Sequence, residues 1–218
     1  MAIEINGSAS SSLKSTGTTT TFSHTVASSL SNSILVFCYS SPVVNVTAVT
    51  WNGTSMTAGA TLSIANYYMA YYYLVNPEAG TYNVVASHSS QATNRGLMGA
   101  ATFTGVNQST PINVYGITGG TSASPSTSVT TTVDGCMLVS WIFSGVGASI
   151  THGASQTELW NSQDSVLERG TADYKLGGAA GSQTMSQTIA VSNTYDLAVI
   201  ALAPFVVTGS SKFFQFFN

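Results

Sequence analysis

The chain has 218 residues, a mass of 22.5 kDa and a formal net charge of −3, and only 6% of its residues are charged, against about 25% in a typical soluble domain. Five Lys and Arg side chains are too few for the basic stripe that phosphate groups attract, which excludes binding to nucleic acid or to an anionic membrane. A hydrophobic content of 44% excludes ordinary disorder, and Ser and Thr, more than a quarter of the chain, replace the usual charges.

Short runs rich in Val, Ile, Thr, Tyr and Phe, separated by clusters of Gly, Asn, Ser and Pro, predict an all-β fold with little or no helix. We expect roughly 12–14 strands after neighbouring runs merge or split, which is typical of an antiparallel β-sandwich. The runs in chain order are 2–6, 19–26, 33–40, 46–51, 54–58, 61–75, 80–88, 96–105, 112–118, 126–133, 136–144, 165–175, 182–191 and 195–205.

Two of these runs carry more specific signals. Asn52-Gly53 stands between two β runs and predicts a type I′ hairpin turn, in which both central residues need a positive φ. Residues 196–202 are apolar at alternating positions on both faces apart from Asp196, so this strand is expected to be central or covered on both sides. Trp51 and Met56, on either side of the turn, are predicted core residues.

We divide the chain into a Ser/Thr-rich N-terminal arm with the first strands at 1–29, a single sandwich domain at 30–205 and an aromatic tail at 206–218. The stretch 121–132 is also low in complexity, but no change of composition separates the two sides of it. Phe103-Thr104-Gly105-Val106 has an echo in Phe143-Ser144-Gly145-Val146, which we interpret as two similar strand ends rather than a duplicated domain.

Motifs for catalysis, metals and cofactors are absent from the sequence. His24, His88 and His152 do not fall at a metal-binding spacing, and Cys38 and Cys136 each sit in an apolar run, as buried free thiols do. The chain has no nucleophile elbow and no phosphate-binding glycine loop. The first residues do not resemble a signal peptide, and no apolar run has the length of a membrane span. We therefore predict no enzyme activity, no metal and no cofactor.

The carboxylates offer two weaker hypotheses. Glu158 and Glu168 flank Trp160, and a glycosidase uses two acids beside an aromatic platform. Asp164 with Asn161 or Gln163 has oxygen ligands for Ca²⁺, but the segment lacks the regular spacing of a calcium loop.

Tyrosines gather in residues 67–74. The period of a strand puts Tyr67, Met69, Tyr71 and Tyr73 on one face and Tyr68, Ala70, Tyr72 and Leu74 on the other. Three interpretations stay open: both faces are internal, one face is a subunit interface, or one face stacks on sugars. The candidate residues for an interface or for glycan stacking are Tyr68, Tyr71, Tyr72, Tyr73 and Trp160.

The C-terminus carries four phenylalanines in its last six residues. Neither a helix nor a strand places Phe213, Phe214, Phe216 and Phe217 on one face, and exposed rings of this size promote association. These four residues are the predicted docking site for a neighbouring subunit or a larger assembly.

Three segments carry a resemblance to a known family. Residues 46–56 (VTAVTWNGTSM), 73–82 (YLVNPEAGTY) and 103–111 (FTGVNQSTP), with a late Ala201-Leu202-Ala203-Pro204, resemble a β-sandwich module of tailed-phage virion proteins and of some bacterial surface proteins. The resemblance covers roughly residues 30–205 and marks strands and turns, not a catalytic site. It implies a jelly-roll-like fold in a structural protein of the virion, while the two ends depart from the matched pattern.

From this resemblance we expect a non-enzymatic capsid decoration or head-fibre protein that assembles through its termini and its aromatic surface. The expected location is the virion, and the expected partners are further copies of the chain, other virion proteins such as the major capsid protein, and host surface glycans. The alternatives are a tail-fibre or adhesin-type module that binds receptors or carbohydrates, and a self-assembling extracellular filament subunit.

Overall fold

The computed structural model describes residues 2–28, 30–62, 67–90, 95–164 and 168–206. These residues form antiparallel strands and no helix, as predicted. The described residues form eighteen strands, more than the fourteen predicted runs. Strands β2, β14 and β15 lie in segments too polar to be recognised, and β7 spans parts of the predicted runs 54–58 and 61–75. The predicted Asn-Gly hairpin is confirmed: β5 and β6 are joined by Asn52 and Gly53, with φ values of 46° and 76°.

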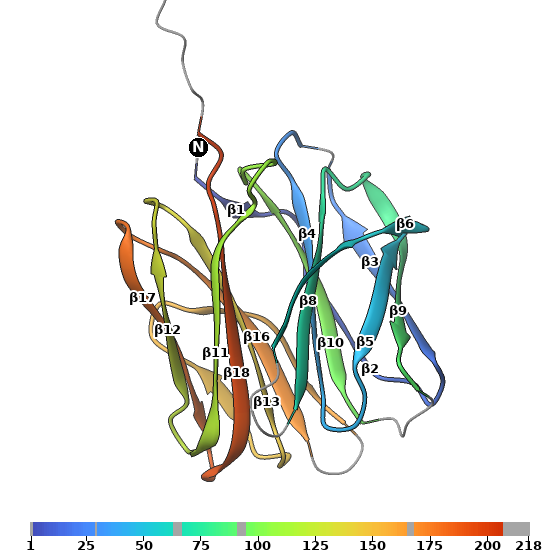
Figure 1. The fold of residues 1–218 in the computed structure, drawn as a ribbon, viewed down its shortest axis with the longest axis vertical. Coiled ribbons are helices and arrows are strands. Elements are labelled where there is room, and N and C mark those ends of the chain that lie inside the picture. The colour runs from blue at the N-terminus through green and yellow to red at the C-terminus, as the bar shows by residue number, and fades with distance from the viewer. Residues whose placement is uncertain (1, 29, 63–66, 91–94, 165–167, 207–218) are drawn as a thin grey trace, which may run out of the picture.

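The N-terminal half of the chain forms one sandwich of two sheets (Figure 1). Inner sheet 1 has the order β1-β10-β4-β8-β7, and β2 pairs with β10 beside β1. Outer sheet 1 has the order β3-β9-β5-β6. The bounds are β1 Glu4–Ile5, β2 Ser10–Leu13, β3 Thr19–Val26, β4 Ile34–Ser41, β5 Val46–Trp51, β6 Thr54–Ser55, β7 Thr57–Leu62, β8 Tyr68–Val75, β9 Gly80–His88 and β10 Leu97–Thr104.

The C-terminal half forms a second sandwich beside the first (Figure 1). Inner sheet 2 has the order β11-β18-β13-β16-β15, and outer sheet 2 has the order β12-β17-β14. The bounds are β11 Ile112–Ser122, β12 Ser126–Thr131, β13 Met137–Ser144, β14 Ile150–His152, β15 Thr157–Gln163, β16 Arg169–Leu176, β17 Gly181–Ile189 and β18 Asn193–Leu202. Strand β18 lies between β11 and β13 and is buried on both faces, as predicted.

Four hydrophobic clusters hold the four sheets together as layers. One core lies within the N-terminal sandwich and contains Trp51 and Met56, as predicted. Two smaller clusters fill the C-terminal sandwich. The largest cluster joins the two inner sheets and contains Trp141, Phe103 and Phe143. The order of layers is therefore outer sheet 1, inner sheet 1, inner sheet 2 and outer sheet 2.

The second sandwich repeats the strand order and the register of the first. Ile34 pairs with Val75 and Phe103, and Met137 pairs with Leu176 and Leu202 at the same place in the second half. In each outer sheet, the last residue of the first strand pairs with a glycine, which is Gly80 in the first half and Gly181 in the second. The φ values of these glycines are 139° and 138°. The echo seen in the sequence is not this repeat, because Phe103 lies in β10 and Phe143 lies in β13, which are not equivalent strands.

The contacts between the two inner sheets follow a two-fold pattern, in which a contact between two positions recurs with the two halves exchanged. By the register equivalence, Tyr67 corresponds to Glu168 and Arg95 corresponds to Thr194. The Tyr67 hydroxyl lies 3.0 Å from the Thr194 hydroxyl, and the Arg95 guanidinium forms an ion pair with Glu168. Equivalent positions thus meet across the interface in both directions, as in the isologous interface of a symmetric dimer.

Candidate functional site

The tyrosine-rich strand β8 is covered on both faces, which is one of the three interpretations left open by the sequence. Tyr67, Met69 and Tyr71 belong to the core between the inner sheets, and Ala70 and Tyr72 belong to the core of the N-terminal sandwich. The alternation predicted for residues 67–74 is therefore confirmed. It serves a strand inside a four-layered molecule, where both faces need apolar cover.

Three of the five candidate aromatic residues are buried by the fold, and Tyr71, at 3% exposed, is one of them. Tyr72 is 7% exposed, and its hydroxyl donates to the Val46 carbonyl oxygen at 3.3 Å. Trp160 is 6% exposed and belongs to the core between the inner sheets. Tyr68 is 41% exposed but stands at the start of β8, outside the groove described next.

Tyr71 and Tyr73 line a surface groove of about 770 Å³ at one rim of the interface between the inner sheets. The walls are the edge strands β7 and β11, one from each half of the chain. The lining residues are neutral: Ala58, Gly59, Ala60, Tyr71, Tyr73, Ile112, Asn113, Val114 and Tyr115. The volume falls in the range of small-molecule sites, roughly 300–1,000 Å³.

Tyr115 completes a set of three phenol rings in this groove and was missed in the sequence. Its side chain is 50% exposed, and its ring centroid lies 6.2 Å from that of Tyr71, with the ring planes at 52°. Tyr71 itself is nearly buried, and this burial raises the pKa of its phenol. A single tyrosine in a run of mixed polar and apolar residues gives no signal by itself, and only the packing of the two halves brings it to Tyr71.

The two carboxylates proposed as a glycosidase couple do not come together. Glu158 pairs with Asp173, which lies five residues along the adjacent strand from Glu168. At about 3.3 Å per residue the two backbones are roughly 16 Å apart, beyond the roughly 5–9.5 Å between the carboxyl groups of a glycosidase. The Glu158 carboxylate accepts a hydrogen bond from the Asn161 amide, whereas Glu168 binds Arg95.

The oxygens suggested for Ca²⁺ are occupied by other partners. The guanidinium of Arg169 donates to Asn161 Oδ1 at 2.8 Å and to Gln163 Oε1 at 2.7 Å. Asp164 Oδ1 accepts the backbone N–H of Glu168 at 3.0 Å. Within the described ranges, no group of three or more His, Cys, Asp or Glu side chains is arranged to hold a metal ion.

A group of polar side chains lies inside the C-terminal sandwich, at positions whose equivalents in the N-terminal sandwich are apolar. The positions of Phe37, Ala70, Tyr72 and Ala86 in the N-terminal core are taken by Ser140, Thr171, Asp173 and Gln187. Gln187 Nε2 donates to Asp173 Oδ2 at 2.9 Å and to Ser140 Oγ at 3.1 Å. His152 Nδ1 lies 3.8 Å from Asp173 Oδ1.

Burial changes the ionisation of two of the buried carboxyl groups, Asp173 and Glu168. It raises the pKa of Asp173 to about 6, although the hydrogen bond from Gln187 opposes the change. Burial and the hydrogen bond with Asp164 raise the pKa of Glu168 to about 7, against the effect of Arg95. The side chains of both residues are fully buried, so neither presents a reactive group at the surface.

The remaining residues singled out in the sequence are either buried in the fold or lie outside the described residues. Burial lowers the pKa of His24 and of His88 to about 4, so both rings are neutral at pH 7, and each contacts a threonine hydroxyl at 3.0 Å. Cys38 and Cys136 are buried free thiols, as predicted. Phe213, Phe214, Phe216 and Phe217 lie outside the described residues.

Comparison with known proteins adds no assignment. The sequence matches no protein-family model and no curated protein. In the part of the chain described above, no helix is long and apolar enough to cross a membrane.

Proposed function

We propose that the chain is a non-enzymatic structural protein of a virion, and specifically a capsid decoration or head-fibre protein that packs side by side with its neighbours. The observation that carries the proposal is the chemistry of the two outermost faces, which the outer sheets present at opposite ends of the layered molecule. The resemblance of residues 30–205 to the phage β-sandwich module supports it from the sequence.

The outward face of outer sheet 1 is a ladder of small neutral side chains. Strand β3 contributes Thr19, Thr21, Ser23 and Thr25, and β9 places Ser87, Val85, Asn83 and Thr81 opposite them. The hydroxyl groups of Thr25 and Thr81 lie 2.8 Å apart.

The outward face of outer sheet 2 repeats this chemistry. Strand β12 contributes Ser126, Ser128 and Thr130, and β17 places Ser186, Thr184 and Ser182 opposite them. The hydroxyl groups of Ser128 and Thr184 lie 2.7 Å apart. None of these outward-facing residues on either sheet is charged.

Such faces favour packing of many identical copies. A charged side chain that is buried between subunits loses hydration, and like charges in adjacent copies repel each other. Hydroxyl groups that already pair within the sheet avoid both costs. The aromatic tail, which lies outside the described residues, stays the predicted docking segment for a neighbouring subunit or the capsid surface.

Charge placed on the two faces should prevent incorporation into particles. We expect the double variant Thr21→Lys/Ser128→Lys to reach at most a tenth of the wild-type copy number in particles purified after complementation, measured by quantitative mass spectrometry. A double variant with the same added charge in exposed loops, Ser109→Lys/Ser192→Lys, is the matched control and should incorporate normally. Equal copy numbers for the face variant and wild type would contradict packing through these faces, and discrete fibres of the purified chain would support the filament alternative instead.

A further inference from the structure

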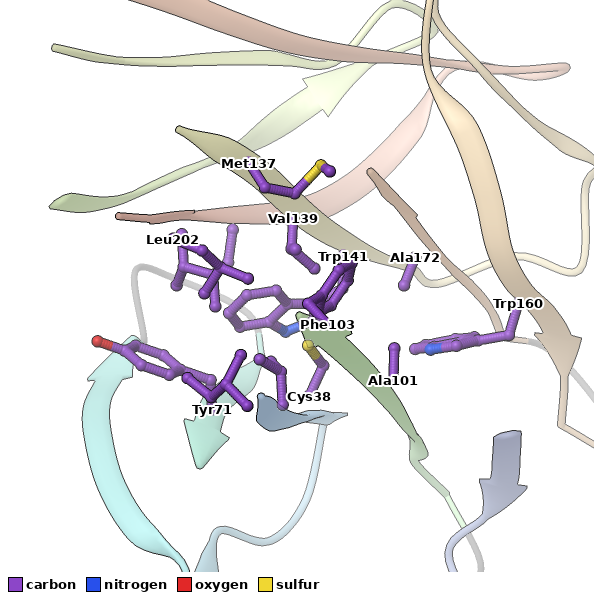
Figure 2. Close-up of a cluster of buried hydrophobic side chains, with 14 of the residues drawn as sticks. Cys38, Tyr71, Ala101, Phe103, Met137, Val139, Trp141, Trp160, Ala172 and Leu202 are labelled. Atoms are coloured by element: carbon purple, nitrogen blue, oxygen red, sulfur yellow. The ribbon is translucent and has the colours of Figure 1, made fainter. Parts of the chain in front are cut away.

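The two rims of the interface between the inner sheets are equivalent by the two-fold repeat, yet only one of them is closed. At the closed rim, strand β15 lies beside β2 and β10, and the Ser11 and Ser162 hydroxyls lie 3.0 Å apart. Trp160 fills this rim, and its indole lies against Gly99 so closely that a Cβ atom at Gly99 would overlap it. In Figure 2, Trp160 lies at one end of the core and Tyr71 lies at the other.

At the open rim the equivalent positions carry other side chains. In the second half, Trp160 precedes Asn161 and pairs with Ala172. The equivalent residue in the first half is Ala60, which precedes Thr61. Tyr71 is the equivalent of Ala172. A Cβ atom at Gly59 would overlap the Tyr71 ring, so the ring lies directly against the β7 backbone. Ala60 leaves this rim without a counterpart of the Trp160 indole, and the groove lined by Tyr71, Tyr73 and Tyr115 opens there.

We propose that this groove binds a neutral saccharide, with a pyranose ring against the half-exposed ring of Tyr115. The charge of the site selects this class of ligand. The nine lining residues include no acid, no base and no histidine, so a charged ligand would lose its hydration without gaining a partner. A purely apolar ligand would cover the Tyr115 hydroxyl without offering it a partner, whereas the Asn113 amide is already paired with Thr132.

The half-exposed Tyr115 and the partly buried Tyr73 offer aromatic surface to a sugar ring. The apolar C–H face of a pyranose packs on the negative face of an aromatic ring, and the phenol hydroxyls reach its hydroxyl groups. Tyrosine offers this contact at a small loss of side-chain entropy. Tyr71 is held further by a hydrogen bond with the backbone of Ala60, so one ring of the site is oriented before the ligand arrives.

The backbone of the walls supplies further polar groups. Strands β7 and β11 are the edges of their sheets, and an edge strand has N–H and C=O groups outside the ladder. This inference goes beyond the proposed function, because saccharide binding by the purified chain does not depend on incorporation into a particle. A coat protein would display the groove in many copies, which raises the avidity of weak sites.

The test uses the purified full-length chain and two variants of the groove. Isothermal titration with neutral gluco-, manno- and galacto-oligosaccharides, preceded by a glycan array that includes sialylated glycans, should find a neutral ligand. Tyr115→Ala removes a half-exposed ring, and Ala60→Trp imitates the closed rim. We expect both to weaken binding at least tenfold. Tyr68→Ala, an exposed tyrosine outside the groove, is the matched control and should bind as wild type does.

Four outcomes would overturn the proposal: no neutral saccharide bound by the wild type at millimolar concentration, equal binding by both groove variants, tighter binding of sialylated glycans, or binding only after residues 207–218 are removed. The last result would assign the groove to the chain's own tail. Near-ultraviolet circular dichroism of each variant distinguishes lost binding from lost folding. Failure of the chain to incorporate into particles would not affect the saccharide-binding measurement.

Discussion

Replacing Trp141 by alanine should lower the free energy of unfolding by about 3–5 kcal/mol, because the core between the inner sheets closes around this side chain. Trp141 is fully buried among residues of both halves (Figure 2). Its ring packs edge-on against the Tyr71 ring, with the two ring centroids 6.2 Å apart. Its indole N–H donates a hydrogen bond to the Tyr39 carbonyl oxygen at 3.2 Å. The substitution removes an indole from four layers that cannot collapse to fill the space.

Denaturant unfolding followed by circular dichroism measures this loss. Val191→Ala is the control, since Val191 is 61% exposed and its truncation should change stability by less than about 0.5 kcal/mol. A loss below about 1 kcal/mol for Trp141→Ala would mean that the two halves do not pack as described. A separate unfolding transition for each half would contradict the shared core in the same way.

Asp173→Asn should change the pH dependence of stability. The pKa of Asp173 is 3.8 in its ordinary state and about 6 in the fold. Between these values the folded chain holds a proton that the unfolded chain has lost, so this group contributes stability below pH 4 and loses it as the pH rises through 6. The asparagine variant does not ionise at this position, so it does not lose stability in this way as the pH rises. Its stability relative to wild type should therefore rise by roughly 2 kcal/mol from pH 4 to pH 7.

The difference between variant and wild type is the quantity to measure, because other groups act in the opposite direction. Burial lowers the pKa of His24 and of His88 to about 4, so protonation of these rings removes stability as the pH falls from 6.5 to 4. Glu4→Gln, which changes an exposed carboxylate, serves as the control. A variant-minus-wild-type difference that stays flat from pH 4 to pH 7 would show that Asp173 is not held in a desolvated site.

Strand chemistry explains how much of the fold is predictable from the sequence. The tyrosine alternation, the Asn-Gly turn and the doubly buried β18 follow from local patterns, and all three are confirmed. The repeat of the sandwich was not predicted, because it is preserved in strand order and register but not in side chains. Phe37 and Ser140 occupy equivalent places, yet one belongs to an apolar core and the other binds Gln187.

The candidate site shows the limit of the same reasoning. Tyr71 and Tyr73 were found because they stand in a conspicuous run, whereas Tyr115 stands alone and meets them only when the halves pack. Trp160 was misjudged for a related reason. A large aromatic residue beside two glutamates resembles a sugar platform, but Gly99 on a distant strand provides the space in which its indole is buried.

A density map of purified particles is the sharpest test of the proposal that this chain is a coat component of a virion. We expect symmetric copies of the four-layered body on the head, with neighbouring copies in contact through the faces of β3 and β9 or of β12 and β17. Particles whose heads contain no density for the chain, together with its absence from their mass spectra, would contradict the proposal.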